Sequence, residues 1–170
     1  MFPDYKDVLE TPDGRVWVVT LSQESRPDLA NWGDEAAFEK DLLLENFVAL
    51  GNAVAALVSD ASSGSLCVDF TDPASGHPMR SSRGPATYPD VEGALTFLKY
   101  PTVISGPCKM LSHPQWGTSV YPTTLFCFHL ANDTSDDGSD DDKDCEWDPV
   151  NILNTAIASC CLNLPDVSTT

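Results

Sequence analysis

The segment LLLENFVALGNAVAALV, residues 42–58, decides the fold prediction for this chain. Its apolar side chains recur at steps of four and three residues, at Leu43, Phe47, Leu50, Val54 and Leu57. This spacing forms one apolar stripe on an α-helix, which we expect over residues 34–60. No charge interrupts residues 46–58, so we expect that half to be buried on all sides. A membrane span needs roughly 20 apolar residues, so we expect that this helix cannot cross a bilayer.

The segments on either side of this helix are typical of β-strands. Residues 15–21 and 65–70 are rich in β-branched and aromatic side chains, as is the longer run 118–130. Pro122 lies inside the last run and predicts either an edge strand or an interruption. Residues 91–99 fit a short helix or a strand, and residues 106–111 fit a turn followed by a strand. Pro149 suits the first position of a last helix.

The length and charge of the chain limit its class. A chain of 170 residues suits one domain. We divide it into a loose lead-in (1–13), a single domain (14–164) and a tail (165–170). The net charge of −17 argues against nucleic acid and against an anionic membrane surface as partners. Nine carboxylates and one lysine crowd residues 133–148, so residues 132–148 have the composition of a disordered acidic loop. We interpret this acidity as favouring solubility, and the alternative is an acidic protein-interaction module or a DNA mimic.

Signatures of enzymes are nearly absent from the sequence. We find no phosphate-binding loop of proper form, no nucleophile elbow and no His-Glu metal pattern. The six cysteines include no CxxC pair, and the three histidines have no metal-ligand spacing. We therefore expect neither a catalytic nor a metal site. Cys67 and Cys127 lie in apolar runs and are expected to be small buried hydrophobes, reduced in the cytosol.

Two acidic residues and one loop are weaker candidates for chemistry. Asp69 and Asp72 could form an acid/base or metal pair, but Asp72 before Pro73 better fits a turn, with Asp69 paired locally. The long loop 77–90 is functional or mobile by its length. Its residues 80–84, RSSRG, are the candidate for contacts with a flavin phosphate.

Cys108 is the thiol of greatest interest. It follows Gly106-Pro107, so we expect it near a turn and reachable from solvent. The charge of Lys109 would favour the thiolate, which is a soft ligand for a metal such as cobalt. The alternative is an ordinary strand cysteine. His113 is five residues away and would lie on the opposite face of a strand, which argues against a catalytic Cys–His pair.

These pieces together resemble the family of the methylmalonic aciduria and homocystinuria type D protein (CblD). The resemblance covers about residues 15–131 and rests on three segments. The first is VVTLSQ (18–23) followed by Asn31-Trp32, Glu39-Lys40 and LLENF (43–47), the second is DFTDPASG (69–76), and the third is GPCK (106–109) with His113 and WGT (116–118). It implies an α+β sandwich similar to flavin nitroreductases, an antiparallel sheet with helices packed on it. It also implies that the chain alone binds neither flavin nor cobalamin.

The resemblance further implies a non-catalytic adaptor in cobalamin trafficking. Family members join the type C cobalamin-processing protein and direct the cofactor to methionine synthase or to methylmalonyl-CoA mutase. Gly106, Lys109, His113 and Trp116 are the implied partner-binding residues. The family's cobalt-ligating cysteine corresponds to Pro107 here, which leaves Cys108 as the candidate ligand within the complex. No mitochondrial leader is visible, so we expect the cytosolic branch. A flavin-dependent reductase of the same fold is the alternative.

Overall fold

The computed structural model describes residues 1–12, 14–130 and 148–162. Most of the acidic loop and the tail from residue 163 therefore lie outside the described residues. The elements, in chain order, are η1 (Pro3–Tyr5), α1 (Lys6–Glu10), β1 (Val16–Glu24), α2 (Asp34–Ala61), β2 (Leu66–Phe70), α3 (Asp90–Leu98), β3 (Thr102–Ser105), β4 (Cys108–Leu111), β5 (Val120–His129) and α4 (Pro149–Leu162).

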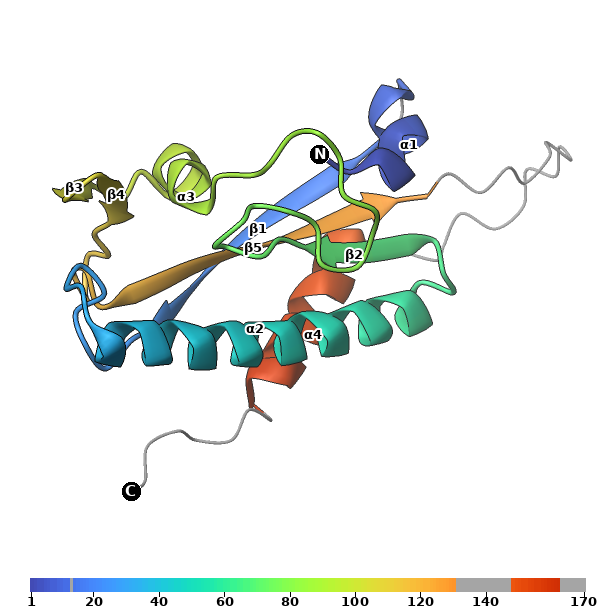
Figure 1. Cartoon of the computed structure of the whole chain (residues 1–170). Coiled ribbons are helices and arrows are strands. Elements are labelled where there is room, and N and C mark those ends of the chain that lie inside the picture. The colour runs from blue at the N-terminus through green and yellow to red at the C-terminus, as the bar shows by residue number, and fades with distance from the viewer. Residues whose placement is uncertain (13, 131–147, 163–170) are drawn as a thin grey trace, which may run out of the picture.

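Two antiparallel sheets carry the fold, which confirms the α+β class. The main sheet has the order β1-β5-β2, with both outer strands antiparallel to β5. The second sheet is the β3-β4 hairpin, which lies at one end of the molecule near the first turns of α2 (Figure 1). Residues 91–99, for which helix and strand were both open, form most of α3.

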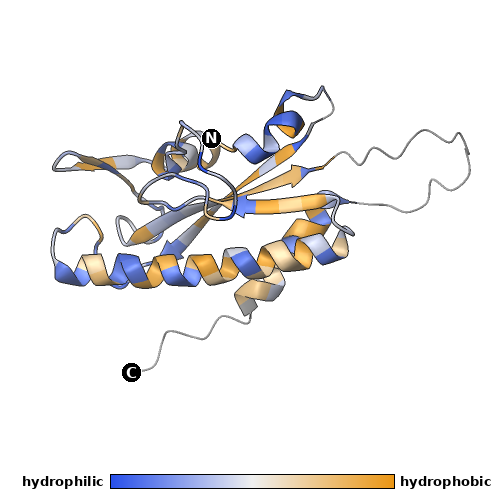
Figure 2. Cartoon of the chain, turned by 45° about the vertical axis from the view of Figure 1, so that its right-hand side comes forward, coloured by the Kyte–Doolittle hydropathy of each residue, from blue (hydrophilic) through white to orange (hydrophobic). Residues whose placement is uncertain are grey.

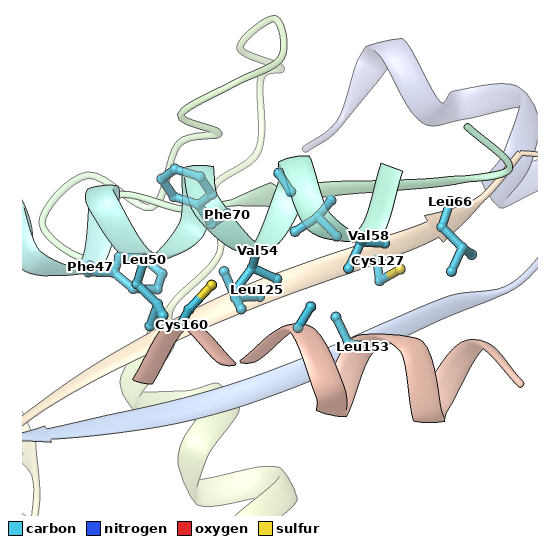
Figure 3. Close-up of a cluster of buried hydrophobic side chains, with 13 residues drawn as sticks. Phe47, Leu50, Val54, Val58, Leu66, Phe70, Leu125, Cys127, Leu153 and Cys160 are labelled. Carbon is cyan, nitrogen blue, oxygen red and sulfur yellow. The ribbon is translucent and has the colours of Figure 1, made fainter. Parts of the chain in front are cut away.

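Helices α2 and α4 cover one face of the main sheet (Figure 1). Their buried side chains form one cluster with those of β2 and β5, including Phe47, Val54, Val58 and Leu125 (Figure 3). The predicted stripe holds except at its end, because Leu57 is 43% exposed and Val58 is buried in its place. Residues 46–58 are therefore not buried all round. A step of four from Val54 keeps the stripe facing the strands.

By length and composition alone, α2 could cross a membrane, contrary to our expectation from the charge-free stretch. It has 28 residues, and its most apolar window has a mean hydropathy of 1.7. Hydrophobic residues recur along α2 and the strands that it faces (Figure 2). The apolar stripe of α2 packs against β2 and α4, as in the core helix of a globular domain.

The N-terminal segment packs on the other face of the sheet and is not the loose lead-in that we predicted. Phe2 is buried, and its ring lies 4.7 Å and 5.1 Å from the ring centres of Phe126 and Phe128. The Tyr5 hydroxyl shares a 3.0 Å hydrogen bond with the Cys67 thiol. Cys67 is consequently a half-buried polar partner, whereas Cys127 is buried as predicted and burial raises its pKa to about 12.

Pro122 neither ends nor interrupts its strand, so both alternatives given for it were wrong. β5 is continuous and central. The Thr124 carbonyl accepts a bond from the Thr71 N–H, so alternate residues 122, 124 and 126 direct their backbone groups towards β2. β2 ends at Phe70, opposite Leu125. A backbone N–H at position 122 would therefore point beyond the end of β2. Its absence in proline costs the sheet no hydrogen bond.

The last helix begins as predicted. Pro149 is its first residue, where a missing N–H is tolerated. Asp148 caps the helix, since its Oδ1 accepts a 2.9 Å hydrogen bond from the Val150 N–H. This cap fixes the point at which the chain returns to the core after the acidic segment.

Candidate functional site

The β3-β4 hairpin presents Cys108 to solvent. Ser105 and Cys108 pair across a two-residue turn formed by Gly106 and Pro107. Gly106 has φ +57°, which glycine adopts without strain. Glycine at the first central position followed by proline fits a type II′ hairpin turn. Cys108 is exposed directly after this turn, which confirms the predicted position.

Two adjoining cavities meet at Cys108. The larger, of about 730 Å³, lies between the hairpin and the N-terminal turns of α2 and α3, and it is lined in part by Leu44, Asp90, Glu92 and Tyr121. The smaller, of about 330 Å³, is lined in part by Asn31, Trp32, Gly33 and Ala36. Cys108, Met110, Leu29, Ala37 and Lys40 line both. Cys108 therefore borders both cavities, whose volumes are enough for a ligand of moderate size.

Trp32 stands beside the hairpin turn and was missing from the predicted site residues. Its side chain is 71% exposed, although its indole N–H donates a 3.3 Å hydrogen bond to the Ser105 Oγ. That hydroxyl in turn donates to the Ala30 carbonyl at 2.7 Å. Because Ser105 is 73 residues further along the chain, no local pattern brings it to Trp32. The pair Asn31-Trp32 in the family motif was the available signal.

Lys109 adjoins Cys108 in sequence but is paired elsewhere. Its ammonium group lies 3.6 Å from the Glu92 carboxylate of α3. The ion pair is partly exposed and links the hairpin to α3 at the rim of the larger cavity. A stabilising effect of Lys109 on the Cys108 thiolate stays a prediction.

His113 and Trp116 form a separate turn behind the hairpin. Their rings stack with centres 4.1 Å apart, and Tyr100 meets His113 edge-on at 5.0 Å. The His113 Nδ1 accepts the N–H of Gln115 at 3.2 Å. Trp116 packs against a buried cluster that includes Leu111 of β4, so this turn supports β4 through apolar contacts. The structure therefore brings Gly106 and Lys109 to Cys108, but it does not bring His113 or Trp116 into the two cavities.

Asp90 is a buried carboxyl at the wall of the larger cavity. It is 4% exposed and opens α3. Burial raises its pKa to about 7, and the hydroxyls of Thr124 and Thr71 partly oppose that shift. A carboxyl with this pKa changes charge near neutrality, and Asp90 is one of the residues that line the larger cavity.

The loop proposed for flavin contacts is already bound to the chain's own carboxylates. Asp69 accepts hydrogen bonds from the Arg80 and Ser81 N–H groups, each at 3.1 Å. Asp4 accepts the Ser82 N–H at 2.8 Å. Asp69 also pairs locally, as we predicted, because its Oδ1 accepts the Phe70 N–H at 2.7 Å. Donors committed to carboxylates cannot cradle a phosphate without rearrangement.

Asp72 forms the predicted turn. Its Oδ1 accepts the Ala74 N–H at 3.0 Å, and its Oδ2 accepts the Ser75 hydroxyl at 2.6 Å. Among the described residues, no three His, Cys, Asp or Glu side chains gather in a way that could hold a metal ion. Asp69 and Asp72 thus have structural partners, and Cys108 remains the candidate for chemistry.

The comparison with known protein families accounts for most of the chain. The family described as methylmalonic aciduria and homocystinuria type D protein matches residues 1–136. The chain belongs to this family. The cobalamin trafficking protein CblD of Homo sapiens is 26% identical over 117 residues, which is 69% of this chain and 38% of the human protein.

Other curated relatives of this CblD-family chain have the same name and a similar identity. The Gallus gallus protein of the same name is 27% identical over 126 residues, covering 74% of this chain and 40% of its own length. The Mus musculus protein is 25% identical over 118 residues. The chain thus spans about two fifths of the length of these relatives. These relatives are named for cobalamin trafficking, and the region matched by the family contains the hairpin and Trp32.

Proposed function

We propose that this CblD-family chain is a non-catalytic adaptor in cobalamin trafficking, and that its β3-β4 hairpin is the surface that meets the cofactor. The adaptor docks on the type C cobalamin-processing protein and directs cobalamin to methionine synthase, with methylmalonyl-CoA mutase as a second destination. The observation that carries the proposal is the exposure of Cys108, which directly follows a two-residue turn and lines two cavities. The choice of cobalamin as the cofactor rests on the family and on the names of its relatives.

In this proposal, the Cys108 thiolate is a ligand of cobalt from the exposed axial side of cobalamin held by the partner. Thiolate is the soft ligand that this motif offers a transition metal. Gly106 and Lys109 lie on the same hairpin and contact the partner, while the His113–Trp116 turn supports the hairpin from behind. Proline at position 107 suits the turn and leaves the sulfur of residue 108 to project.

We further propose a nitroreductase-like fold, an isolated chain without a bound cofactor, and a cytosolic location. The two-layer arrangement is compatible with a nitroreductase-like sandwich. The isolated chain binds neither flavin nor cobalamin, which the commitment of the loop 80–82 donors to Asp69 and Asp4 supports. The cysteines in the described residues are free, which agrees with a reducing compartment such as the cytosol.

The test is Cys108→Ser in a complex with cobalamin-loaded type C protein. We expect the variant to form the complex, because serine keeps the turn, and to lose the thiolate-dependent change in the cobalamin absorption spectrum. Cys161→Ser is the matched control, since Cys161 is also free and exposed but lies on α4. Its spectrum should equal that of the wild type.

Two results would count against the proposal. A spectrum unchanged by Cys108→Ser would remove the sulfur–cobalt bond and leave only docking. Failure of the wild-type chain to bind the type C protein, with or without cobalamin, would remove the adaptor role itself.

A further inference from the structure

Trp32 is an exposed aromatic side chain that is nevertheless held in place. Its indole nitrogen is tied to the Ser105 Oγ, and that hydroxyl is tied to the Ala30 carbonyl. The ring also lies against Gly106, where a side chain would come within 3.6 Å of it. A large aromatic surface left in water while its rotamer is fixed is typical of a binding residue, because little entropy is lost on contact.

The same cavity contains Trp32 and Cys108. The remaining lining of the smaller cavity is mostly apolar, with Leu29, Ala36, Ala37 and Met110, and Lys40 is its one charged member. The hairpin fixes the position of both residues, since β4 carries Cys108 and Ser105 of β3 holds the indole. A group that occupies this cavity therefore has both the indole and Cys108 in its lining.

We infer that Trp32 and Cys108 form one binding site, in which Trp32 is the platform for a flat, largely apolar ring system and Cys108 engages the reactive atom of that ligand. That the ligand is the corrin of cobalamin presented by the type C protein rests on the proposed function. The assignment of Trp32 as a ligand-contacting residue goes beyond it.

The chemistry of the platform selects the class of ligand. The one polar atom of the indole is directed to Ser105, so the exposed part of the ring offers only carbon. Such a surface gains little from an ion or a small polar molecule, and it gains most from a flat partner that covers it. The macrocycle of a corrin has that shape around a central metal, which is the atom that a thiolate would engage.

The first arm of the test uses the isolated chain and needs no partner. The probes are N-(1-pyrenyl)maleimide, which is flat and aromatic, and N-ethylmaleimide, which is small. The rate of alkylation at Cys108 is followed by mass spectrometry of its peptide, because Cys161 is also exposed. We expect the pyrenyl-to-ethyl rate ratio to fall severalfold in Trp32→Ala, with the N-ethylmaleimide rate unchanged.

Phe38→Ala is the matched control. Phe38 is 72% exposed and lies on the first turns of α2, outside the lining of both cavities. It should keep the wild-type ratio, and Trp32→Phe should keep most of it because an aromatic face remains. An unchanged ratio in Trp32→Ala would overturn the shared site. A parallel fall in both rates would also overturn it, since that result means altered access to the sulfur.

The second arm identifies the ligand in the complex. The dissociation constant is measured for the cobalamin-loaded and the cobalamin-free type C protein. We expect Trp32→Ala to weaken binding of the loaded form about tenfold and to leave the free form unchanged. Equal weakening of both forms would mean that Trp32 contacts the partner protein and would overturn the corrin assignment. If the wild type bound neither form, the adaptor proposal would fail, while the maleimide ratio would still decide the shared site.

Discussion

The two sheets of this molecule have opposite surroundings. The main sheet is covered on one face by α2 and α4 and on the other by the N-terminal segment, so that Phe47, Phe70 and Phe128 are inaccessible to water. The β3-β4 hairpin leaves Ile104, Cys108 and the neighbouring Trp32 exposed. Apolar burial stabilises the first region. The second region retains exposed apolar surface, which is typical of an interaction site. Under the proposed function, stability and recognition are therefore carried by different sheets.

The largest expected effect breaks the first region. Phe47→Ala removes a ring that is fully buried and lies 5.3 Å from Phe70, centre to centre. We expect the free energy of unfolding in urea to fall by about 3–5 kcal/mol. Phe38→Ala makes the same substitution on the exposed side of the same helix and should change it by less than about 0.5 kcal/mol. Similar losses in both variants would refute the contrast between the two sides of α2.

An intermediate effect is expected at Asp90, which lies between the two regions. The folded pKa of about 7 exceeds the ordinary value of 3.8, so the folded state binds more protons than the unfolded state between those pH values. The contribution of Asp90 to stability is thus present in acid and is lost as pH rises towards 7. Asp90→Asn keeps the shape without the charge. Urea unfolding should show the variant more stable than the wild type by about 1–3 kcal/mol at pH 8.

At pH 4 the two proteins should differ much less, because Asp90 is then protonated in the folded state. A stability difference that is the same at pH 4 and pH 8 would mean that burial does not hold this carboxyl in its neutral form. The wild-type protein at the two pH values serves as the reference for all other titrating groups.

The smallest effect is expected on the hairpin. Ile104 is 74% exposed on β3, so Ile104→Ser removes almost no buried surface. We expect the free energy of unfolding to change by less than about 0.5 kcal/mol, and the rate of Cys108 alkylation to stay as in the wild type. A loss above about 1 kcal/mol would show that this face is covered and would erase the contrast between the sheets.

Local pattern predicted much of the fold. The helix 34–61 and the strands around it follow from periodicity and composition, which act within a few residues. Tertiary contacts decided the rest. Phe2 is buried because Phe126 and Phe128 lie opposite it, and Pro122 is tolerated because β2 ends before reaching it. Neither fact is encoded near the residue concerned.

In the candidate site too, local features were predictable and long-range contacts were not. The turn before Cys108 follows from Gly106-Pro107, since glycine and proline restrict the backbone locally. Trp32 was not predicted as part of the site, because its position depends on a hydrogen bond to a residue 73 positions away. His113 and Trp116 were grouped with Cys108 by the family resemblance, but a strand end and a tight turn separate them in space.

The strand order β1-β5-β2 also governs when this protein can fold during its synthesis. Neither β1 nor β2 pairs with the other, so both wait for β5, which is complete only at His129. At ribosomal rates of about 5–20 residues per second, the interval from β1 to β5 lasts roughly 5–20 s. Throughout it, the apolar sides of β1 and α2 have no finished sheet to cover them. The β3-β4 hairpin, joined by two residues, can close within microseconds of leaving the ribosome.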